Sequence, residues 1–89
     1  MKSRTTERFR KAYANLPEQI QSQVKVAYQL FSRNPYHPSL HFKQVHSTQP
    51  IYSARISLDY RVLGVREGEE LIWFWVGSHE EYNKLLSRL

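Results

Sequence analysis

The stretch GSHEEY, residues 77–82, follows the most apolar run of the chain and places a histidine, two glutamates and a tyrosine on consecutive positions. Histidine titrates near neutral pH, so His79 can serve as an acid or a base, and a well-placed group of this kind accelerates a reaction roughly 10²–10⁴-fold. The same stretch has a structural explanation. Ser78 followed three residues later by Glu81 is a capping box, and Glu80 and Glu81 complement the positive end of a helix dipole. From spacing alone, His79 is either a catalytic group or an exposed first-turn residue.

Two arginines upstream have the chemistry to bind a phosphate. In the segment 51–57, Ser53 and Arg55 alternate with apolar residues, which predicts a strand with one polar face. Arg61 is the second residue of the next predicted strand, after a turn that contains Asp59. Guanidinium groups at the facing ends of adjacent strands can hold one phosphate through paired hydrogen bonds. The alternatives are that Arg61 is an ordinary surface residue and that the Asp59 side chain fixes the hairpin.

Two helices are expected before these strands. The first spans about residues 6–15, and its apolar side chains recur at helical spacing: Phe9, Ala12, Tyr13 and Leu16. The second begins at Pro17 and ends where Asn34 meets Pro35. Its apolar stripe repeats at the same spacing: Ile20, Val24, Ala27, Tyr28 and Phe31. These elements are predicted to pair as a helical hairpin.

Four short strands are predicted after residue 39, over 40–46, 51–57, 60–66 and 71–77. Their connections are so short that neighbouring strands must be antiparallel. A further strand at residues 3–5 is only weakly indicated. Trp73 and Trp75 are predicted to share one strand face, in the core rather than as base-stacking platforms. The predicted fold class is α+β, with an N-terminal helical hairpin packed on a four-stranded antiparallel sheet and a short C-terminal helix.

Composition sets limits on the class of protein. The chain has 89 residues, of which 40% are hydrophobic, and this predicts one domain over residues 1–89. It has no cysteine, which excludes disulfides and thiolate chemistry, and His41 and His46 are spaced to lie on opposite faces of a strand, so no metal site is predicted. The longest apolar run, residues 71–76, is too short for export or membrane insertion, so a cytoplasmic protein is expected.

The formal net charge of +5 favours polyanionic partners, although a basic segment can also be a solvated face. Positive charge is concentrated in the first eleven residues, which carry five basic side chains against one acidic side chain. Phosphate contacts without sequence specificity are predicted for Lys43 and for three residues of this arm: Arg4, Arg8 and Lys11.

The order of the elements, together with the motifs NPYHPSLHFKQV, ARISLDYRVLG and GSHEEYNKLL, resembles the RelE/ParE superfamily of toxins from bacterial type II toxin–antitoxin systems. The resemblance covers almost the whole chain and is closest to the RelE-type and YafQ-type endoribonucleases. It implies a RelE-like fold and cleavage of mRNA on the ribosome without a metal or a small-molecule cofactor. It also implies an acidic antitoxin protein as partner.

By this resemblance, His79 stands where YafQ-type enzymes have a catalytic histidine, and Arg61 matches the arginine of RelE that contacts the scissile phosphate. Asp59 matches an aspartate of the YafQ type, and Arg55 stands where that group has another histidine. Tyr82 lies near the position of a catalytic tyrosine of RelE, three residues short of the usual spacing, and core packing of its ring is an equal alternative. The resemblance thus implies a catalytic set of these five residues.

One further match is weaker, and several functions stay open. His37, in HPSL, matches another YafQ-type histidine when a gap is allowed, and it is predicted to bind RNA. Departures from the family pattern, such as Ser53 and Arg55 in place of paired lysines, concern activity more than fold. The alternatives to an endoribonuclease are a non-enzymatic ParE-like gyrase inhibitor, a toxin-fold protein that only binds an antitoxin, and a general nucleic-acid binder.

Overall fold

A computed structural model of the chain describes residues 1–89. The elements follow in the order β1 (Lys2–Thr5), α1 (Glu7–Ala14), α2 (Glu18–Arg33), the 3₁₀ helix η1 (Pro38–Leu40), β2 (Lys43–Gln44), β3 (Ile51–Ser57), β4 (Tyr60–Glu67), β5 (Glu70–Ser78) and α3 (His79–Leu86). The strands form one sheet in the order β1-β5-β4-β3-β2. Strand β1 is parallel to β5, and the other neighbours are antiparallel.

The predicted α+β class is confirmed, and the predicted strand count is wrong. Strand β1 adds a fifth strand at the free edge of β5, where Ser3 lies opposite Leu71. A parallel neighbour so far away in sequence leaves no turn signal, which explains why it was only weakly indicated. No helix of the chain is long and apolar enough to cross a membrane.

The helical hairpin forms as predicted, and its ends have identifiable causes. The Thr6 side chain caps α1 by accepting a hydrogen bond from the backbone N–H of Phe9 at 3.1 Å. Pro17 precedes α2, and the helix ends at Arg33, just before the Asn34–Pro35 dipeptide. The Gln21 side chain donates to the carbonyl of Tyr13 at 3.0 Å and ties the two helices together.

The prediction of a strand over residues 40–46 is wrong for most of its length. Pro38 begins the 3₁₀ helix η1, and His41, which follows it, adopts a left-handed conformation with φ 46°. A left-handed residue interrupts an extended chain. Only Lys43 and Gln44 pair with β3, opposite Ser53 and Tyr52.

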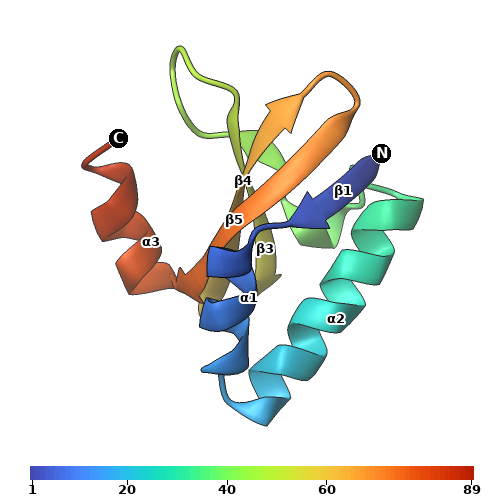
Figure 1. The fold of residues 1–89 in the computed structure, drawn as a ribbon, viewed down its shortest axis with the longest axis vertical. Helices are drawn as coiled ribbons and strands as arrows, with labels where there is room; N and C mark the ends of the chain where they lie inside the picture. Colours follow the sequence, from blue (N-terminus) through green and yellow to red (C-terminus); the bar gives the residue numbers. More distant parts are fainter.

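Helices cover the two faces of the sheet unequally, and Figure 1 shows α2 and α3 on opposite sides of the strands. The first face packs against α1 and α2 and holds a core cluster of 10 buried residues that includes Phe9, Phe31 and Trp73. The second face packs against α3 and holds a cluster of 3 buried residues: Ile51, Leu63 and Tyr82. The second face therefore has the smaller buried cluster, and more of its surface is open to a ligand.

The prediction that Trp73 and Trp75 share a strand face is wrong. Strands β4 and β5 pair Leu63 with Trp75 and Gly64 with Trp73, so the register shifts by one residue at Phe74. A bulge of this kind reverses the alternation of side chains beyond it. Trp73 consequently packs under the helical hairpin, whereas Trp75 packs on the side of α3.

Candidate active site

An open depression of about 550 Å³ lies on the second face, between β2, the paired ends of β3 and β4, and α3. Its lining is rich in cationic and titratable side chains, and no aspartate or glutamate contributes to it. The lining residues are His41, Lys43, Gln44, Val45, Ser53, Arg55, Arg61, His79, Tyr82, Asn83 and Leu86. A concave surface of this charge suits an anionic ligand.

The two arginines lie side by side, as the sequence predicted, because Arg55 of β3 and Arg61 of β4 are directly opposite in the sheet register. One terminal nitrogen of Arg61 donates to three carbonyls of the β3–β4 turn, those of Ser57 at 2.6 Å, Tyr60 at 3.0 Å and Leu58 at 3.3 Å. These hydrogen bonds orient the guanidinium before any ligand binds.

Electrostatics at this pair favour an anion. Partial burial, and then the neighbouring charge of Arg55, lower the pKa of Arg61 from its ordinary value, while Tyr82 and Asp59 act in the opposite direction. Arginine nevertheless stays protonated at neutral pH. Two adjacent cations with no carboxylate between them leave a net positive site that a phosphate would neutralise.

His79 is held at the start of α3 by the capping box expected from the sequence. The Ser78 hydroxyl accepts from the backbone N–H of Glu81 at 3.2 Å, and the Glu81 carboxylate accepts from the Ser78 backbone N–H at 3.3 Å. The backbone N–H of His79 donates to the carbonyl of Asp59 at 2.6 Å, which ties the helix start to the β3–β4 turn. In the GSHEEY motif, Ser78 and Glu81 therefore cap α3, and His79 lines the depression.

Tyr82 is a core residue whose hydroxyl reaches the floor of the depression. Its side chain is buried, 7% exposed, and its hydroxyl donates to the Ser53 hydroxyl at 3.2 Å. The ring lies 6.5 Å from that of Trp75 and 5.9 Å from that of His79, measured between centroids. The Tyr82 ring therefore packs beside the His79 ring. This agrees with the alternative that Tyr82 serves core packing.

His41 is a residue of the depression that sequence reasoning missed as a site residue. It is exposed, and its Nε2 lies 3.5 Å from a terminal nitrogen of Arg55. The residues around His41 were predicted to form a strand. No sequence pattern indicates the left-handed conformation of His41, which places its ring near Arg55. Only the loop conformation places His41 in the site.

Several predicted residues lie outside the depression. The Asp59 side chain is exposed in the turn and does not line it, although the Asp59 carbonyl positions His79. His37 caps η1 by accepting from the backbone N–H of Ser39 at 3.2 Å. Of the predicted RNA-binding residues, only Lys43 lines the depression.

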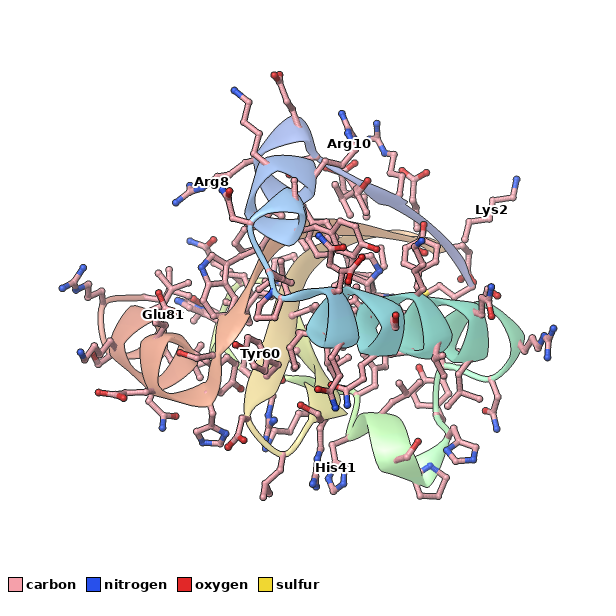
Figure 2. All side chains as sticks on the ribbon, turned by 90° about the horizontal axis from the view of Figure 1, so that it is seen from below. Lys2, Arg8, Arg10, His41, Tyr60 and Glu81 are labelled. Atoms are coloured by element: carbon pink, nitrogen blue, oxygen red, sulfur yellow. The ribbon has the colours of Figure 1, made fainter.

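The basic N-terminal arm belongs to another surface. Arg4 pairs with Glu70 at 3.1 Å, and Lys11 pairs with Glu7 at 3.5 Å. Figure 2 shows Arg8 on α1 at the opposite end of the view from His41. The contacts predicted for Arg4, Arg8 and Lys11 therefore concern a surface separate from the depression, and they stay predictions.

Sequence comparison identifies the family. A family model described as a ParE-like toxin domain matches residues 18–84, which is well over half of the chain. The chain therefore belongs to the ParE-like toxin family, and the predicted membership of the RelE/ParE superfamily is confirmed. No curated protein matches the sequence.

Solved structures confirm the RelE-like fold. The toxin–antitoxin complex RelB–RelE of Methanococcus jannaschii matches with a TM-score of 0.71 and 17% identity, over 91% of this chain and 95% of the other. YafQ of Escherichia coli matches with a TM-score of 0.72 and 13% identity, over 90% and 94%. The RelBE2 complex of Mycobacterium tuberculosis matches with a TM-score of 0.68 and 24% identity, over 88% and 96%. At these identities the likeness establishes the fold alone.

Proposed function

We propose that this protein is the toxin of a type II toxin–antitoxin system and a metal-independent endoribonuclease that cleaves mRNA on the ribosome and so inhibits translation in the cytoplasm. The observation that carries the proposal is the convergence of His79, Arg55 and Arg61 on one depression that no carboxylate lines. The fold shared with RelE-type and YafQ-type toxins supports it.

The chemistry available in the depression suits cleavage by internal attack of the RNA 2′-hydroxyl on the adjacent phosphate. This reaction needs one group to take the hydroxyl proton, another to protonate the leaving 5′-oxygen, and cations around a phosphorane that gains negative charge. The Arg55–Arg61 pair supplies the cations, and Lys43 at the rim can hold a flanking phosphate. His79 supplies proton transfer.

An acidic antitoxin is the proposed protein partner. The solved relatives from Methanococcus jannaschii and Mycobacterium tuberculosis are complexes of a toxin with its antitoxin. The net charge of +5 and the uncompensated arginine pair both favour an acidic segment as the neutralising group. Such a segment on the depression would exclude RNA by occupying the same cations.

The test is tightly controlled expression followed by mapping of mRNA ends. The wild-type protein should arrest growth and produce new 5′ ends within translated messages. His79→Gln and Arg55→Ala should each reduce cleavage about 10²–10⁴-fold, the range for losing one acid–base or electrostatic group. Arg33→Ala is the matched control for Arg55, because Arg33 is exposed at the end of α2 and lies outside the depression. Intact messages and unaffected translation on induction would refute the activity.

A second candidate function is a non-enzymatic inhibitor of DNA gyrase, or a toxin-fold protein that only binds an antitoxin. The family match to a ParE-like domain favours it. Accumulation of cleaved gyrase–DNA complexes after induction, without RNA cuts, would establish gyrase as the target in place of mRNA.

A further inference from the structure

The depression needs a second group for proton transfer, and the residue expected from the sequence does not supply it. Asp59 does not line the depression, and no other carboxylate does. The Tyr82 hydroxyl is buried and already donates to Ser53. Among the lining residues, His41 is the one other histidine besides His79, and histidine is the side chain most often used as a general acid or base.

His41 adopts a conformation that ordinary residues avoid. Its φ of 46° is the one left-handed value among the non-glycine residues of the chain. Strained backbone of this kind persists where the surroundings hold it, and such positions cluster at functional sites. The turn follows directly from η1, whose Leu40 is buried at 2% exposure, so a packed side chain anchors the loop that presents His41.

The contact with Arg55 identifies which ring nitrogen of His41 is available. Nε2 of His41 lies 3.5 Å from the Arg55 guanidinium, and because arginine has only donors, this nitrogen is the acceptor of any hydrogen bond between the two. His41 therefore presents a lone pair at Nε2 toward the arginine pair. The distance is long for a hydrogen bond, so a phosphate can withdraw the guanidinium at little cost and leave that lone pair free.

His79 presents the opposite chemistry. Its Nδ1 is buried without a hydrogen-bond partner, whereas its Nε2 is not among the buried unpaired atoms. Nε2 is therefore the nitrogen of His79 that is free to exchange a proton with a ligand, and it carries an N–H when the ring is protonated. Both histidines line the depression, and protonated His79 can donate from Nε2 where His41 offers an acceptor.

Strand register places the two histidines on either side of the arginine pair. His41 contacts Arg55, Arg55 is opposite Arg61, and Arg61 is opposite Gly77, two residues before His79. Adjacent strands are about 4.8 Å apart, so Arg55 and Gly77 are separated by roughly 10 Å across the sheet. A phosphate on the arginines would have one histidine on each side, as in-line displacement requires.

Building on the endoribonuclease activity proposed above, we propose that His41 is the general base of this reaction and His79 its general acid. His41 Nε2 takes the proton of the 2′-hydroxyl as the 2′-oxygen forms its bond to phosphorus. The bond from phosphorus to the 5′-oxygen breaks, and that oxygen takes the Nε2 proton of the His79 imidazolium, which becomes a neutral imidazole. The products are a 2′,3′-cyclic phosphate and a 5′-hydroxyl, with both protons accounted for.

A substrate with sulfur in place of the leaving 5′-oxygen separates the two roles, because a thiolate leaves without being protonated. The probe is a ribosome-bound mRNA carrying this substitution at the mapped cleavage position, beside the unmodified mRNA. On the unmodified mRNA, His41→Asn and His79→Gln should each slow cleavage about 10²–10⁴-fold. On the sulfur-containing mRNA, His79→Gln should regain nearly the wild-type rate, and His41→Asn should stay slow.

Two controls keep the result specific to His41. Asparagine tolerates the left-handed conformation, so His41→Asn should keep the wild-type unfolding midpoint. His46→Asn keeps a side-chain acceptor for the backbone N–H groups of Thr48 and Gln49 and lies outside the depression, so it should cleave both substrates within a few-fold of wild type.

Three outcomes would overturn the assignment. Wild-type rates for His41→Asn on the unmodified mRNA would remove His41 from the chemistry. Recovery of His41→Asn, and not of His79→Gln, on the sulfur-containing mRNA would reverse the two roles. Absence of cleavage of either mRNA by the wild-type protein would refute the endoribonuclease activity itself, and the assignment with it.

Discussion

The two faces of the sheet are built from the same strands and serve different purposes. In β3, Ala54 and Ile56 point into the core beneath the helical hairpin, while Ser53 and Arg55 line the depression. The first face is covered by α1 and by α2, which has 16 residues, whereas the second is covered by α3, which has 8. A short helix leaves part of a face open to water, and that part carries charged side chains that burial would penalise.

The contrast also appears in how each face holds its residues. On the first face, aromatic rings pack edge to face, with Phe31 at 5.0 Å from Phe42 and 5.1 Å from Trp73 between centroids. On the second face, hydrogen bonds orient the side chains, such as Tyr82 to Ser53 and Arg61 to the turn carbonyls. Stability is therefore expected to depend most on the first face and activity most on the second.

The largest expected effect on stability is that of Phe31→Ala, which removes a ring that is 2% exposed. Loss of a fully buried phenylalanine lowers the free energy of unfolding by about 3–5 kcal/mol. Phe74→Ala on the second face is the matched change, and it should cost less than half as much because Phe74 is only partly buried. Urea unfolding followed by circular dichroism measures both. Equal losses would contradict the division between the faces.

Two glycines provide a finer comparison. A Cβ at Gly64 would lie 2.5 Å from Leu71 Cδ1, 2.8 Å from Trp73 Cε3 and 3.1 Å from the Ile72 carbonyl, all in well-packed surroundings. Gly64→Ala should therefore lower the free energy of unfolding by about 1–3 kcal/mol, the usual range for overpacking.

The counterpart on the second face is Gly77→Ala. Its new Cβ would meet the Trp75 indole at 2.5 Å, and Trp75 is only partly buried, so the ring has space to move aside. We expect a smaller loss than for Gly64→Ala in the same urea unfolding measurement. A larger loss for Gly77→Ala would mean that the second face is packed as tightly as the first.

The two helix caps separate stability from activity. Thr6→Ala and Ser78→Ala each remove a side-chain cap and should each lower the free energy of unfolding by about 1 kcal/mol. Only Ser78→Ala loosens the start of α3, where His79 is held, so only this change should also slow RNA cleavage. Thermal unfolding and the cleavage assay are run on both variants. Equal slowing by the two would show that cleavage follows overall stability.

The smallest expected effect is on the salt dependence of RNA binding. Lys43→Ala should weaken binding of a short single-stranded RNA and reduce the slope of log K against log salt by about 0.7, the value for one lost phosphate contact. Arg8→Ala removes the same charge from α1, away from the depression, and should leave the slope unchanged for an oligonucleotide that spans only the depression. Equal changes in slope would place the basic arm on the path of the RNA.

Much of the fold and part of the site could be predicted from local patterns. The apolar spacing of both helices, the strands after residue 50 and the capping box at Ser78 each depend on residues close together in the sequence. The approach of Arg55 to Arg61 was likewise predictable, because a short turn joins their strands and so sets the register.

What could not be predicted depends on contacts between distant segments. The pairing of β1 with β5, the bulge at Phe74 that separates Trp73 from Trp75, and the left-handed turn at His41 follow from packing that no local pattern encodes. The same applies to the placement of Asp59, which the resemblance assigned to the catalytic set and whose side chain lies outside the depression.

By itself, the sequence determined the helical hairpin, the three strands after residue 50, the family and the residues able to transfer protons or bind phosphate, because these depend on residue type and short spacing. Only the tertiary structure decided which of those residues meet. It brought His41 to Arg55 across 14 positions of sequence, and it left Arg8 and Lys11 on another surface. The physical reason is that a sheet directs neighbouring side chains to opposite faces, so their final environment depends on which helices cover each face.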